Sequence, residues 1–410
     1  MRAAKRSLPC LASALAAALV PQLGCSSPSS SPPDPAAATE GTSLVAPAPT
    51  GCAPRAVEVS LDYKDSCAVM GDGHVACWGR NTSGQLGNGS TSTCPNPGPS
   101  FVPSIDDAVA VSTGPDHTCV LRAGGASWCW GDSFFGQLGD GERTSSTSPR
   151  LVAGLRGLAQ QVASVGFTCA TRTDGGVSCW GTDAAGTLGD GAANPLSPSP
   201  VSVTGITNAL AVSAGESHAC ALLASGTVKC WGFNGSGQIG DGSYREADTP
   251  VDVKGVAGVK ALASGVVHTC ALHQDGSVVC WGFNGSGALG NGTRVDSPTA
   301  VAVAGLDDAR AIAAGGYETC ALRRSGLVVC WGKNDSGQLG DGSTNEADAP
   351  APVRGLHDAR AIAVGDGHAC AVRERGDVVC WGANDLGQLG DGTTVARSEP
   401  VRVVGLEASP

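Results

Sequence analysis

Paired cysteines are the residues of this sequence with the clearest chemical potential. Two thiols at a fixed spacing either form a disulfide or bind a metal ion, and zinc sites favour cysteines separated by only two to four residues. No such close couple occurs in this chain. Instead, seven pairs recur with a separation of ten positions: Cys67 and Cys77, Cys119 and Cys129, Cys169 and Cys179, Cys220 and Cys230, Cys270 and Cys280, Cys320 and Cys330, and Cys370 and Cys380. The pattern predicts seven disulfides rather than metal centres.

The sixth repeat shows why such a pair suits a disulfide. Arg324, Ser325 and Gly326 fit a three-residue hairpin loop that closes on a glycine in the left-handed conformation. That loop pairs Arg323 with Leu327, and it therefore places Cys320 directly opposite Cys330. The two cysteines fall on a pair without backbone hydrogen bonds, where the Cα atoms approach to about 4.5 Å, within reach of a disulfide.

The other candidate ligands do not form a metal site. His117, His218, His268 and His368 each stand two positions before a cysteine, but the same slot holds Asp65, Phe167 and Glu318 in other repeats. A ring of ligands would thus be broken, and structural histidines are expected. The acidic turns, such as Asn334 to Gly337, lack the twelve-residue calcium loop that ends in a glutamate. No metal and no cofactor is expected.

Enzymatic motifs are also missing from the sequence. It contains no Gly-x-Ser-x-Gly elbow, no phosphate-binding Walker loop and no His-Glu-x-x-His. No pair of acidic residues departs from the repeat in a way that marks it for glycosidase chemistry. We therefore expect a protein that is not an enzyme.

The composition limits the fold and the partners. The chain has 410 residues and 60 glycines, about twice the usual share, which favours β structure with many turns over long helices. Eighteen cysteines indicate an oxidising compartment. The net charge of −11 disfavours nucleic acid and anionic membrane surfaces, since both require a basic footprint.

The first 55 residues predict an export signal followed by a tether. Residues 1–25 have a charged start and a short apolar stretch, as in a bacterial export signal. They end in Gln22-Leu23-Gly24-Cys25, which resembles a lipobox, although Gln22 replaces the usual aliphatic residue. Lipidation of Cys25 is expected, with plain secretion as the alternative. Residues 26–55, rich in Ser, Pro and Ala, predict a flexible tether. Cys52 and Cys94 are expected to pair and to fix the end of this tether.

Residues 56–410 are filled by one repeated unit of about 50 residues, a period typical of propeller blades. In the sixth unit, strands are expected at 309–314, 319–323 and 327–331, with a weak fourth strand beginning near Pro352–Val353. The units lie at about 56–107, 108–158, 159–208, 209–258, 259–308, 309–358 and 359–405.

The segment after each second cysteine carries the most specific signal. It reads Trp-Gly, a short loop and Gly-x-Leu-Gly-Asp/Asn-Gly, as in Trp331-Gly332 and Gly337 to Gly342. With Gly-x-x-His before several first cysteines, as at Gly265 to His268, this resembles the regulator of chromosome condensation repeat family. The resemblance covers about 355 residues. It implies an all-β, seven-bladed propeller with four-stranded antiparallel blades.

That family includes a nucleotide-exchange factor for a small GTPase that docks on chromatin, a plant UV-B photoreceptor and a secreted bacterial β-lactamase inhibitor. Their shared mechanism is protein recognition by loops on a rigid propeller. An exported acidic protein would not meet a cytosolic GTPase or chromatin. Photoreception would need clustered rim tryptophans, yet only Trp128 lies outside the Trp-Gly motif.

Departures from the repeat point to one binding face. In an up-down blade, the loops that follow the first and third strands emerge on the same side. Most aromatic residues other than tryptophan map to these loops, and aromatics with arginine are enriched at protein interfaces. The alternative is that each ring folds over its own loop. The candidate contact residues are Phe134, Phe135, Phe233, Phe283, Tyr244, Arg245, Arg80, Tyr63 and Tyr317.

Together these observations predict a monomeric, non-enzymatic propeller at the bacterial outer membrane or cell surface, or secreted. It would bind another protein through one face and meet the membrane only through an N-terminal lipid. An inhibitor of an extracellular enzyme and a glycan-binding propeller are the alternatives, and nucleotide exchange is the least favoured.

Overall fold

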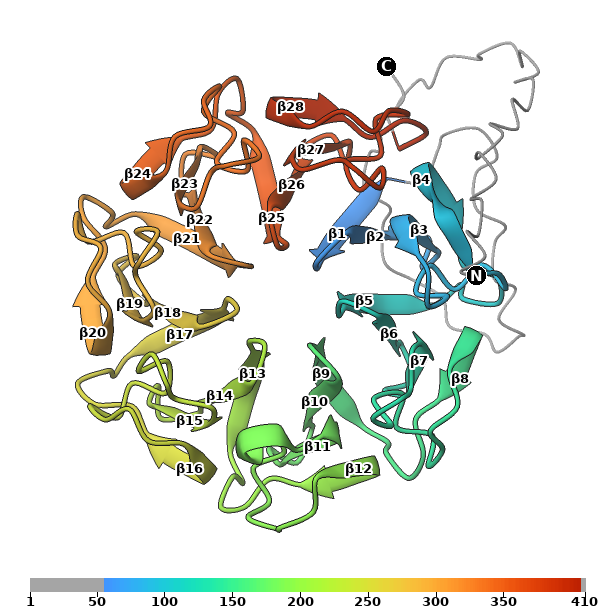
Figure 1. The fold of residues 1–410 in the computed structure, drawn as a ribbon, viewed down its shortest axis with the longest axis vertical. Helices are drawn as coiled ribbons and strands as arrows, with labels where there is room; N and C mark the ends of the chain where they lie inside the picture. The colour runs from blue at the N-terminus through green and yellow to red at the C-terminus, as the bar shows by residue number, and fades with distance from the viewer. Residues whose placement is uncertain (1–54, 407–410) are drawn as a thin grey trace, which may run out of the picture.

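The computed structural model describes residues 55–406, which form a ring of seven four-stranded antiparallel sheets (Figure 1). Each sheet is built from four consecutive strands, so every repeat forms one blade, and the predicted fold class is confirmed. The signal, the lipobox cysteine Cys25 and most of the tether lie outside the described residues. One short 3₁₀ turn, η1 (Ala184–Gly186), stands in the third blade.

Two strands of each blade lie toward the axis. The innermost strands, called A here, are β1 (Ala56–Leu61), β5 (Ala108–Thr113), β9 (Leu158–Ala163), β13 (Ala209–Ala214), β17 (Val259–Ser264), β21 (Ala309–Ala314) and β25 (Ala359–Val364). The B strands are β2 (Asp65–Met70), β6 (His117–Arg122), β10 (Phe167–Arg172), β14 (His218–Leu223), β18 (His268–His273), β22 (Glu318–Arg323) and β26 (His368–Arg373).

The other two strands complete each blade toward the outer edge. The C strands are β3 (Val75–Asn81), β7 (Ser127–Gly131), β11 (Val177–Thr182), β15 (Val228–Gly232), β19 (Val278–Gly282), β23 (Val328–Gly332) and β27 (Val378–Gly382). The outermost D strands are β4 (Ser92–Phe101), β8 (Ser146–Leu151), β12 (Leu196–Ser202), β16 (Ala247–Asp252), β20 (Ser297–Ala302), β24 (Ala347–Pro352) and β28 (Arg397–Arg402).

The prediction for the fourth strand of the sixth blade was wrong. We expected it to begin near Pro352–Val353, but β24 ends at Pro352, and Val353 lies beyond it with its N–H bonded to the carbonyl of Val328 at 2.9 Å. Proline cannot donate to a strand ladder and is confined to edge strands. An outermost strand accepts Pro350 and Pro352, which hide its pattern in the sequence.

The hairpin register agrees with the predicted disulfides. The N–H of Arg323 bonds to the carbonyl of Leu327 at 2.8 Å, and Cys320 stands opposite Cys330. All seven predicted pairs are disulfide-bonded, one in each blade, with Cα atoms 4.0–4.1 Å apart. In chain order, the bonds join Cys67 to Cys77, Cys119 to Cys129, Cys169 to Cys179, Cys220 to Cys230, Cys270 to Cys280, Cys320 to Cys330 and Cys370 to Cys380.

The remaining predicted disulfide lies partly outside the described chain. Cys94, in β4, is disulfide-bonded. Its predicted partner Cys52 lies outside the described residues, so that pairing stays a prediction.

The repeated tryptophan of each blade joins it to the blade before. Trp331 is fully buried, and its indole N–H donates to the carbonyl of Ala288 at 2.8 Å. A glycine of the preceding blade lies against the ring: a Cβ on Gly290, where φ is +64°, would meet the Trp331 indole at 2.6 Å. The same N–H···O bond occurs at all seven seams, from Trp78, Trp130, Trp180, Trp231, Trp281, Trp331 and Trp381.

The ring closes through the same tryptophan bond as every other seam. Trp78 of the first blade donates to the carbonyl of Gln388 of the last at 2.8 Å, and Ser66 bonds His368 at 2.9 Å. Within residues 55–406 no strand is exchanged between the first and last blades. Closure therefore rests on side-chain packing and hydrogen bonds between sheets.

Backbone bonds define the two faces of the ring. At each seam the first N–H of an A strand bonds to a B–C hairpin glycine of the preceding blade, as from Ala309 to Gly276 at 3.0 Å. The B–C hairpins and D–A connections thus share one side, the hairpin face. The A–B and C–D loops share the other, the loop face, where the N–H of Lys333 bonds to the carbonyl of Tyr317 at 3.0 Å.

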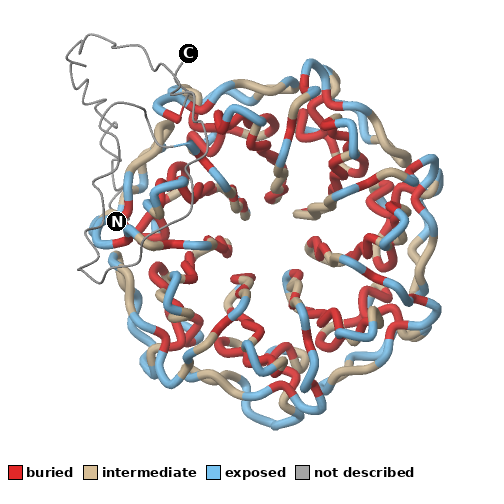
Figure 2. The backbone as a smooth tube through the Cα atoms, turned by 180° about the vertical axis from the view of Figure 1, so that it is seen from behind, coloured by how far each residue is buried: buried red, intermediate tan, exposed pale blue. Residues whose placement is uncertain are grey.

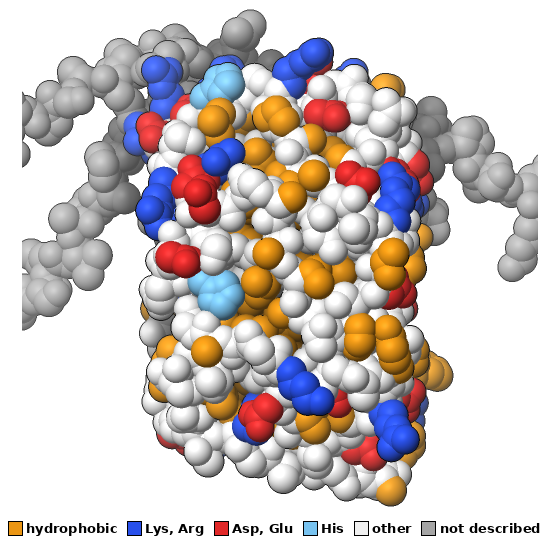
Figure 3. Space-filling view, turned by 90° about the vertical axis from the view of Figure 1, so that its left-hand side faces the viewer, with side chains coloured by type: hydrophobic (Ala, Val, Ile, Leu, Met, Phe, Trp, Pro, Cys, Tyr) orange, Lys and Arg blue, Asp and Glu red, His pale blue; other side chains and the backbone are white. Residues whose placement is uncertain are grey.

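Burial follows this layout. Buried residues run through the middle of every blade, and exposed residues lie in the loops and along the outer strands (Figure 2). Seen from the side where Figure 1 places β20, hydrophobic side chains occupy the middle of the outer edge and charged side chains gather toward its two rims (Figure 3).

Candidate functional site

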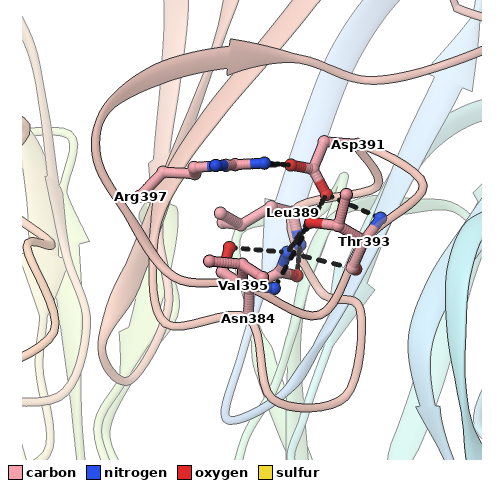
Figure 4. A network of polar contacts seen from close by, with 6 residues as sticks. All are labelled: Asn384, Leu389, Asp391, Thr393, Val395 and Arg397. Atoms are coloured by element: carbon pink, nitrogen blue, oxygen red, sulfur yellow. Dashed lines mark hydrogen bonds and ion pairs between the residues drawn. The ribbon is translucent and has the colours of Figure 1, made fainter.

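The C–D loops of the loop face are rigid structures fixed by a buried asparagine. In the seventh blade, the carbonyl oxygen of Asn384 accepts the N–H of Leu389 at 3.0 Å, and its amide donates to the backbone carbonyls of Thr393 at 3.2 Å and Val395 at 3.1 Å (Figure 4). Asp391 accepts the N–H of Thr393 and pairs with Arg397. Asn81, Asn234, Asn284 and Asn334 build the same network in four other blades.

The second blade replaces this asparagine and carries two phenylalanines at its loop tip. Phe134 is 62% exposed and Phe135 38% exposed, and their rings meet edge to face with centroids 5.0 Å apart. The loop is held by Asp132, which accepts the N–H of Phe134 at 3.2 Å. Arg143 donates to the carbonyl of Phe134 at 2.9 Å and lies 5.5 Å from the centroid of its ring. We call Phe134, Phe135 and Arg143 the blade-two knob.

Three other predicted contact residues also project from the loop face. Tyr63, in the first A–B loop, is 42% exposed, and the Lys64 ammonium lies 5.4 Å from its ring centroid. Tyr244 is 55% exposed, and Arg245 beside it is exposed too. These residues stand on the first and fourth blades, so the structure places them on one face without joining them into one cluster with the knob.

The remaining predicted residues pack against the protein. The Phe233 and Phe283 rings fold over their own loops, because a Cβ on Gly235 or Gly285 would meet the ring at 2.5 Å. Tyr317 meets the Phe283 ring with centroids 5.4 Å apart, under the Lys333 ammonium.

Arg80 is also held within the protein. Its guanidinium pairs with Asp116 of the second blade at 3.1 Å. For Phe233, Phe283, Tyr317 and Arg80, packing within the face explains the side chain.

Acidic residues at the hub were not predicted as part of this face. Asp62, Glu216 and Asp366 each stand one or two residues after the end of an A strand, and they line a central cavity of about 360 Å³. Burial raises the pKa of Asp62 well above its usual range, and the nearby charges of Asp366, Asp116 and Glu216 raise it further. The three carboxylates lie on blades one, four and seven. Glu216 and Asp366 share one position of the repeat and Asp62 stands one position earlier, so the sequence pattern alone does not group them.

The histidines in the slot two positions before a cysteine form hydrogen bonds between blades through Nε2, while their Nδ1 atoms are buried without a hydrogen-bond partner among the described residues. The Nε2 atoms of His117, His218 and His268 each lie 2.8 Å from a threonine hydroxyl of the next blade. Burial lowers the pKa of His268 to about 4. Within residues 55–406, no group of three or more His, Cys, Asp or Glu residues is placed to hold a metal ion.

Two blades fill that slot with an acid. Both carboxylate oxygens of Asp65 are buried without a hydrogen-bond partner in the described part of the chain, and burial raises its pKa well above its usual range. Glu318 is better satisfied. It accepts the N–H of Gly367 at 2.8 Å and that of Tyr317 at 3.1 Å, yet burial raises its pKa to about 8. Two seams therefore hold a carboxyl group whose neutral form is favoured.

Comparisons with known proteins agree with this architecture. A family model described as "RCC1-like domain" matches residues 22–315 and, in an overlapping alignment, residues 168–410. The chain belongs to this RCC1-like family. The resemblance read from the Trp-Gly and Gly-x-Leu-Gly motifs is thereby confirmed.

Similar proteins differ widely in what their names say they do. The chain is 30% identical over 198 residues to the Ultraviolet-B receptor UVR8 of Arabidopsis thaliana, an alignment that covers 46% of this chain and 44% of the receptor. It is 32% identical over 195 residues to human HERC4, a probable E3 ubiquitin-protein ligase, with 46% of this chain and 18% of that protein covered. The alignments span less than half of each relative.

Solved structures share the fold at low identity. Yeast RCC1 (Prp20), crystallised with Kap60, has a TM-score of 0.71 at 21% identity, with 84% of each chain covered. Human WBSCR16 has a TM-score of 0.72 at 23% identity and covers 81% of this chain and 94% of its own. A second Prp20p structure, from Saccharomyces cerevisiae, is described together with binding to Gsp1p and histones.

The compartment follows from the cysteines. Seven disulfides in one domain indicate an oxidising environment, because thiols are kept reduced in the cytosol. Among the described residues, no helix has the length and apolar character required to cross a bilayer.

Proposed function

We propose that this protein is a non-enzymatic, exported propeller that binds another protein through its loop face. The observation that carries this proposal is the blade-two knob. Phe134 and Phe135 occupy a loop position filled mostly by small or polar residues in other blades, and Phe134 stays 62% exposed. Large aromatic side chains with an arginine beside them are the usual anchors of protein interfaces.

The rigidity of the loop face supports the same function. Five asparagine networks and seven disulfide-stapled blades hold the loops in place before any partner arrives. Little conformational entropy would then be lost when a partner binds, so a modest set of exposed anchors suffices for useful affinity. Relatives of the family recognise proteins, as the Kap60 complex of yeast RCC1 illustrates.

Protein recognition is favoured over glycan binding by the surroundings of Phe134. A sugar needs a flat aromatic platform, whereas the Arg143 guanidinium lies 5.5 Å from the centroid of this ring. Inhibition of an extracellular enzyme is one form that protein binding could take. Nucleotide exchange on a cytosolic GTPase does not fit a protein with seven disulfides.

The test uses the exported protein as bait in envelope and culture extracts. The double variant Phe134→Ala/Phe135→Ala removes the knob, and Phe101→Ala removes an aromatic ring that is 51% exposed at the hairpin end of β4. We expect one partner to be captured by the wild type and by Phe101→Ala and to be lost by the double variant.

The wild type and both variants must have the same melting temperature, so that a loss of capture cannot come from unfolding. Equal capture by the double variant and the wild type would remove the knob from the interface. Capture lost only with Phe101→Ala would move the interface to the hairpin face.

A further inference from the structure

The hairpin face carries a ring of exposed residues that neither the repeat pattern nor the proposed function uses. The second residue of each A strand lies at a β-bulge, an irregularity that turns a side chain out of the ladder. All seven are exposed at the hairpin-side end of the innermost strands. We call them the mouth ring: Val57, Val109, Ala159, Leu210, Lys260, Arg310 and Arg360.

The mouth ring has two chemically different halves. Blades one, two and four contribute aliphatic side chains that are 43% (Val57), 52% (Val109) and 61% (Leu210) exposed. Blades five, six and seven contribute Lys260 and two arginines. A single ring thus combines exposed apolar side chains with three positive charges, a combination that suits the boundary between lipid headgroups and acyl chains.

The positive charges are fixed in place and not neutralised. The guanidinium of Arg310 donates to the carbonyl of Ala359 at 2.6 Å, and that of Arg360 donates to the carbonyl of Ala56, each across a seam. Lys260 reaches the carbonyl of Arg310 at 3.5 Å. These acceptors are neutral, and in residues 55–406 none of the three side chains forms an ion pair.

Neighbouring hairpins extend the positive half. Arg324 is exposed and donates to the carbonyl of Asp275 at 2.7 Å, and Arg375 is exposed on the next hairpin. Asp275, Asp307 and Glu374 are exposed on the same side and offset part of this charge. The net charge of −11 therefore coexists with a local basic region on this face.

The chain also enters the propeller at this face. The N–H of Ala56 bonds to the carbonyl of Gly376, in the seventh B–C hairpin, at 3.1 Å. The predicted tether and lipid-bearing Cys25 precede this point in the sequence. The first strand of the propeller therefore begins on the same side as the mouth ring.

We propose that the mouth ring docks the propeller on an anionic phospholipid surface. Lys260, Arg310 and Arg360 would contact headgroup phosphates, which match the donor geometry of guanidinium groups. Val57, Val109 and Leu210 would enter the headgroup boundary on the other side of the mouth. The loop face would remain free, so this inference does not depend on the proposed protein partner.

Vesicle sedimentation tests the proposal with the chain carrying Cys25→Ser, which removes the predicted lipid. The probes are phosphatidylcholine vesicles with and without an equal part of phosphatidylglycerol, at low salt. We expect binding only to the anionic vesicles, lost at high salt. Each basic residue near an anionic surface strengthens binding about fivefold, so Lys260→Gln/Arg310→Gln/Arg360→Gln should weaken it roughly a hundredfold.

The matched control removes the same charge from the loop face: Lys64→Gln/Arg294→Gln/Lys333→Gln. It should bind anionic vesicles as the wild type does, and both variants must unfold at wild-type temperature. If either triple variant is unstable, the milder variant Leu210→Ser replaces it as the test. This variant should weaken binding to anionic vesicles a few fold. Equal binding to both kinds of vesicle, or equal loss in both triple variants, would overturn the proposal. Tighter binding to soluble polyglutamate than to anionic vesicles would assign the face to an acidic protein instead.

Discussion

The seams between blades and the loop face obey different rules in this molecule. Every seam repeats one arrangement, in which a buried tryptophan donates its indole N–H to the preceding blade. The loop face repeats only its hydrogen-bonded frame, while the exposed side chains change from blade to blade. Phe134 and Phe135 appear in one blade, and Tyr244 in another.

The contrast separates stability from recognition. A residue repeated seven times is explained by packing, because each blade must bury the same surface against its neighbour. A residue that breaks the repeat and also stays exposed, as Phe134 does, has no such reason and becomes a candidate for contact with another molecule. Substitutions in the two regions should therefore affect different quantities.

The largest expected effect is at a seam. Trp281→Ala removes a fully buried ring and its bond to the carbonyl of Gln238, and it should lower the free energy of unfolding by about 4 kcal/mol. Urea denaturation measures the change. Trp128→Ala is the matched control, since Trp128 is only partly buried and stands outside the repeat. If Trp128→Ala lowered the free energy of unfolding as much as Trp281→Ala, the repeated tryptophans would not differ in stability from the one outside the repeat, and this account would be contradicted.

The next effect is the pH dependence of stability, which should differ between the seam that holds Glu318 and the seam that holds His268. The folded protein holds the proton of Glu318 up to about pH 8, whereas an unfolded glutamate loses it near 4.5. The stability of the wild type should thus fall as pH rises between these values. Glu318→Gln should remove the part of this fall that Glu318 causes, a gain on the order of 3 kcal/mol at about pH 9, while the partly buried Glu58 keeps its own contribution.

The neighbouring seam provides the opposite case. His268 is held neutral, with its pKa lowered to about 4, so the wild type should lose stability as pH falls from 6.5 toward 4. His268→Gln should remove the part of that loss that His268 causes, while the buried His117, His218 and His368 keep theirs. Unfolding curves of both variants from acidic to alkaline pH test the pair. A variant whose stability changes with pH as steeply as that of the wild type, in the range where its own residue titrates, would contradict the account of the slot.

Removal of one disulfide tests how much the stability of a blade depends on it. Cys320→Ala/Cys330→Ala opens one small loop and should cost about 3 kcal/mol in the free energy of unfolding. Thermal melts in the presence and absence of reductant give the comparison. Reductant should lower the melting temperature of the variant less than that of the wild type, because the variant already lacks one of the disulfides. An unchanged melting temperature would show that the core alone fixes the blade.

The smallest effect on stability is expected within the loop frame. Asn384→Ala removes one carbonyl acceptor and several donated bonds from a buried position, at a cost of about 2 kcal/mol. Hydrogen exchange should rise locally at Leu389, Thr393 and Val395. Exchange that rises throughout the seventh blade would mean that the loop and the sheet unfold together.

The sequence predicted the interior well because spacing determines it. A separation of ten between paired cysteines and a three-residue loop leave one register for the hairpin, and that register is the one observed. The outermost strand was misplaced in the sixth blade because an edge strand needs no apolar alternation and accepts Pro350 and Pro352.

The face was predicted less completely, for two physical reasons. Phe233 and Phe283 fold back because Gly235 and Gly285 leave room for their rings, and a linear pattern does not show which way a ring turns. The hub acids and the mouth ring were missed because their members lie on different blades, far apart in the sequence. They come together only where the ring of blades brings its innermost strands to one axis.

Hydrogen–deuterium exchange of the propeller, alone and with its captured partner, tests the central claim most directly. The account predicts protection in the loop that holds Phe134, Phe135 and Arg143, and in the loop-face segments around Tyr63 and Tyr244. The B–C hairpins should exchange as in the free protein. Protection confined to the hairpins, with the blade-two knob unchanged, would contradict recognition through the loop face.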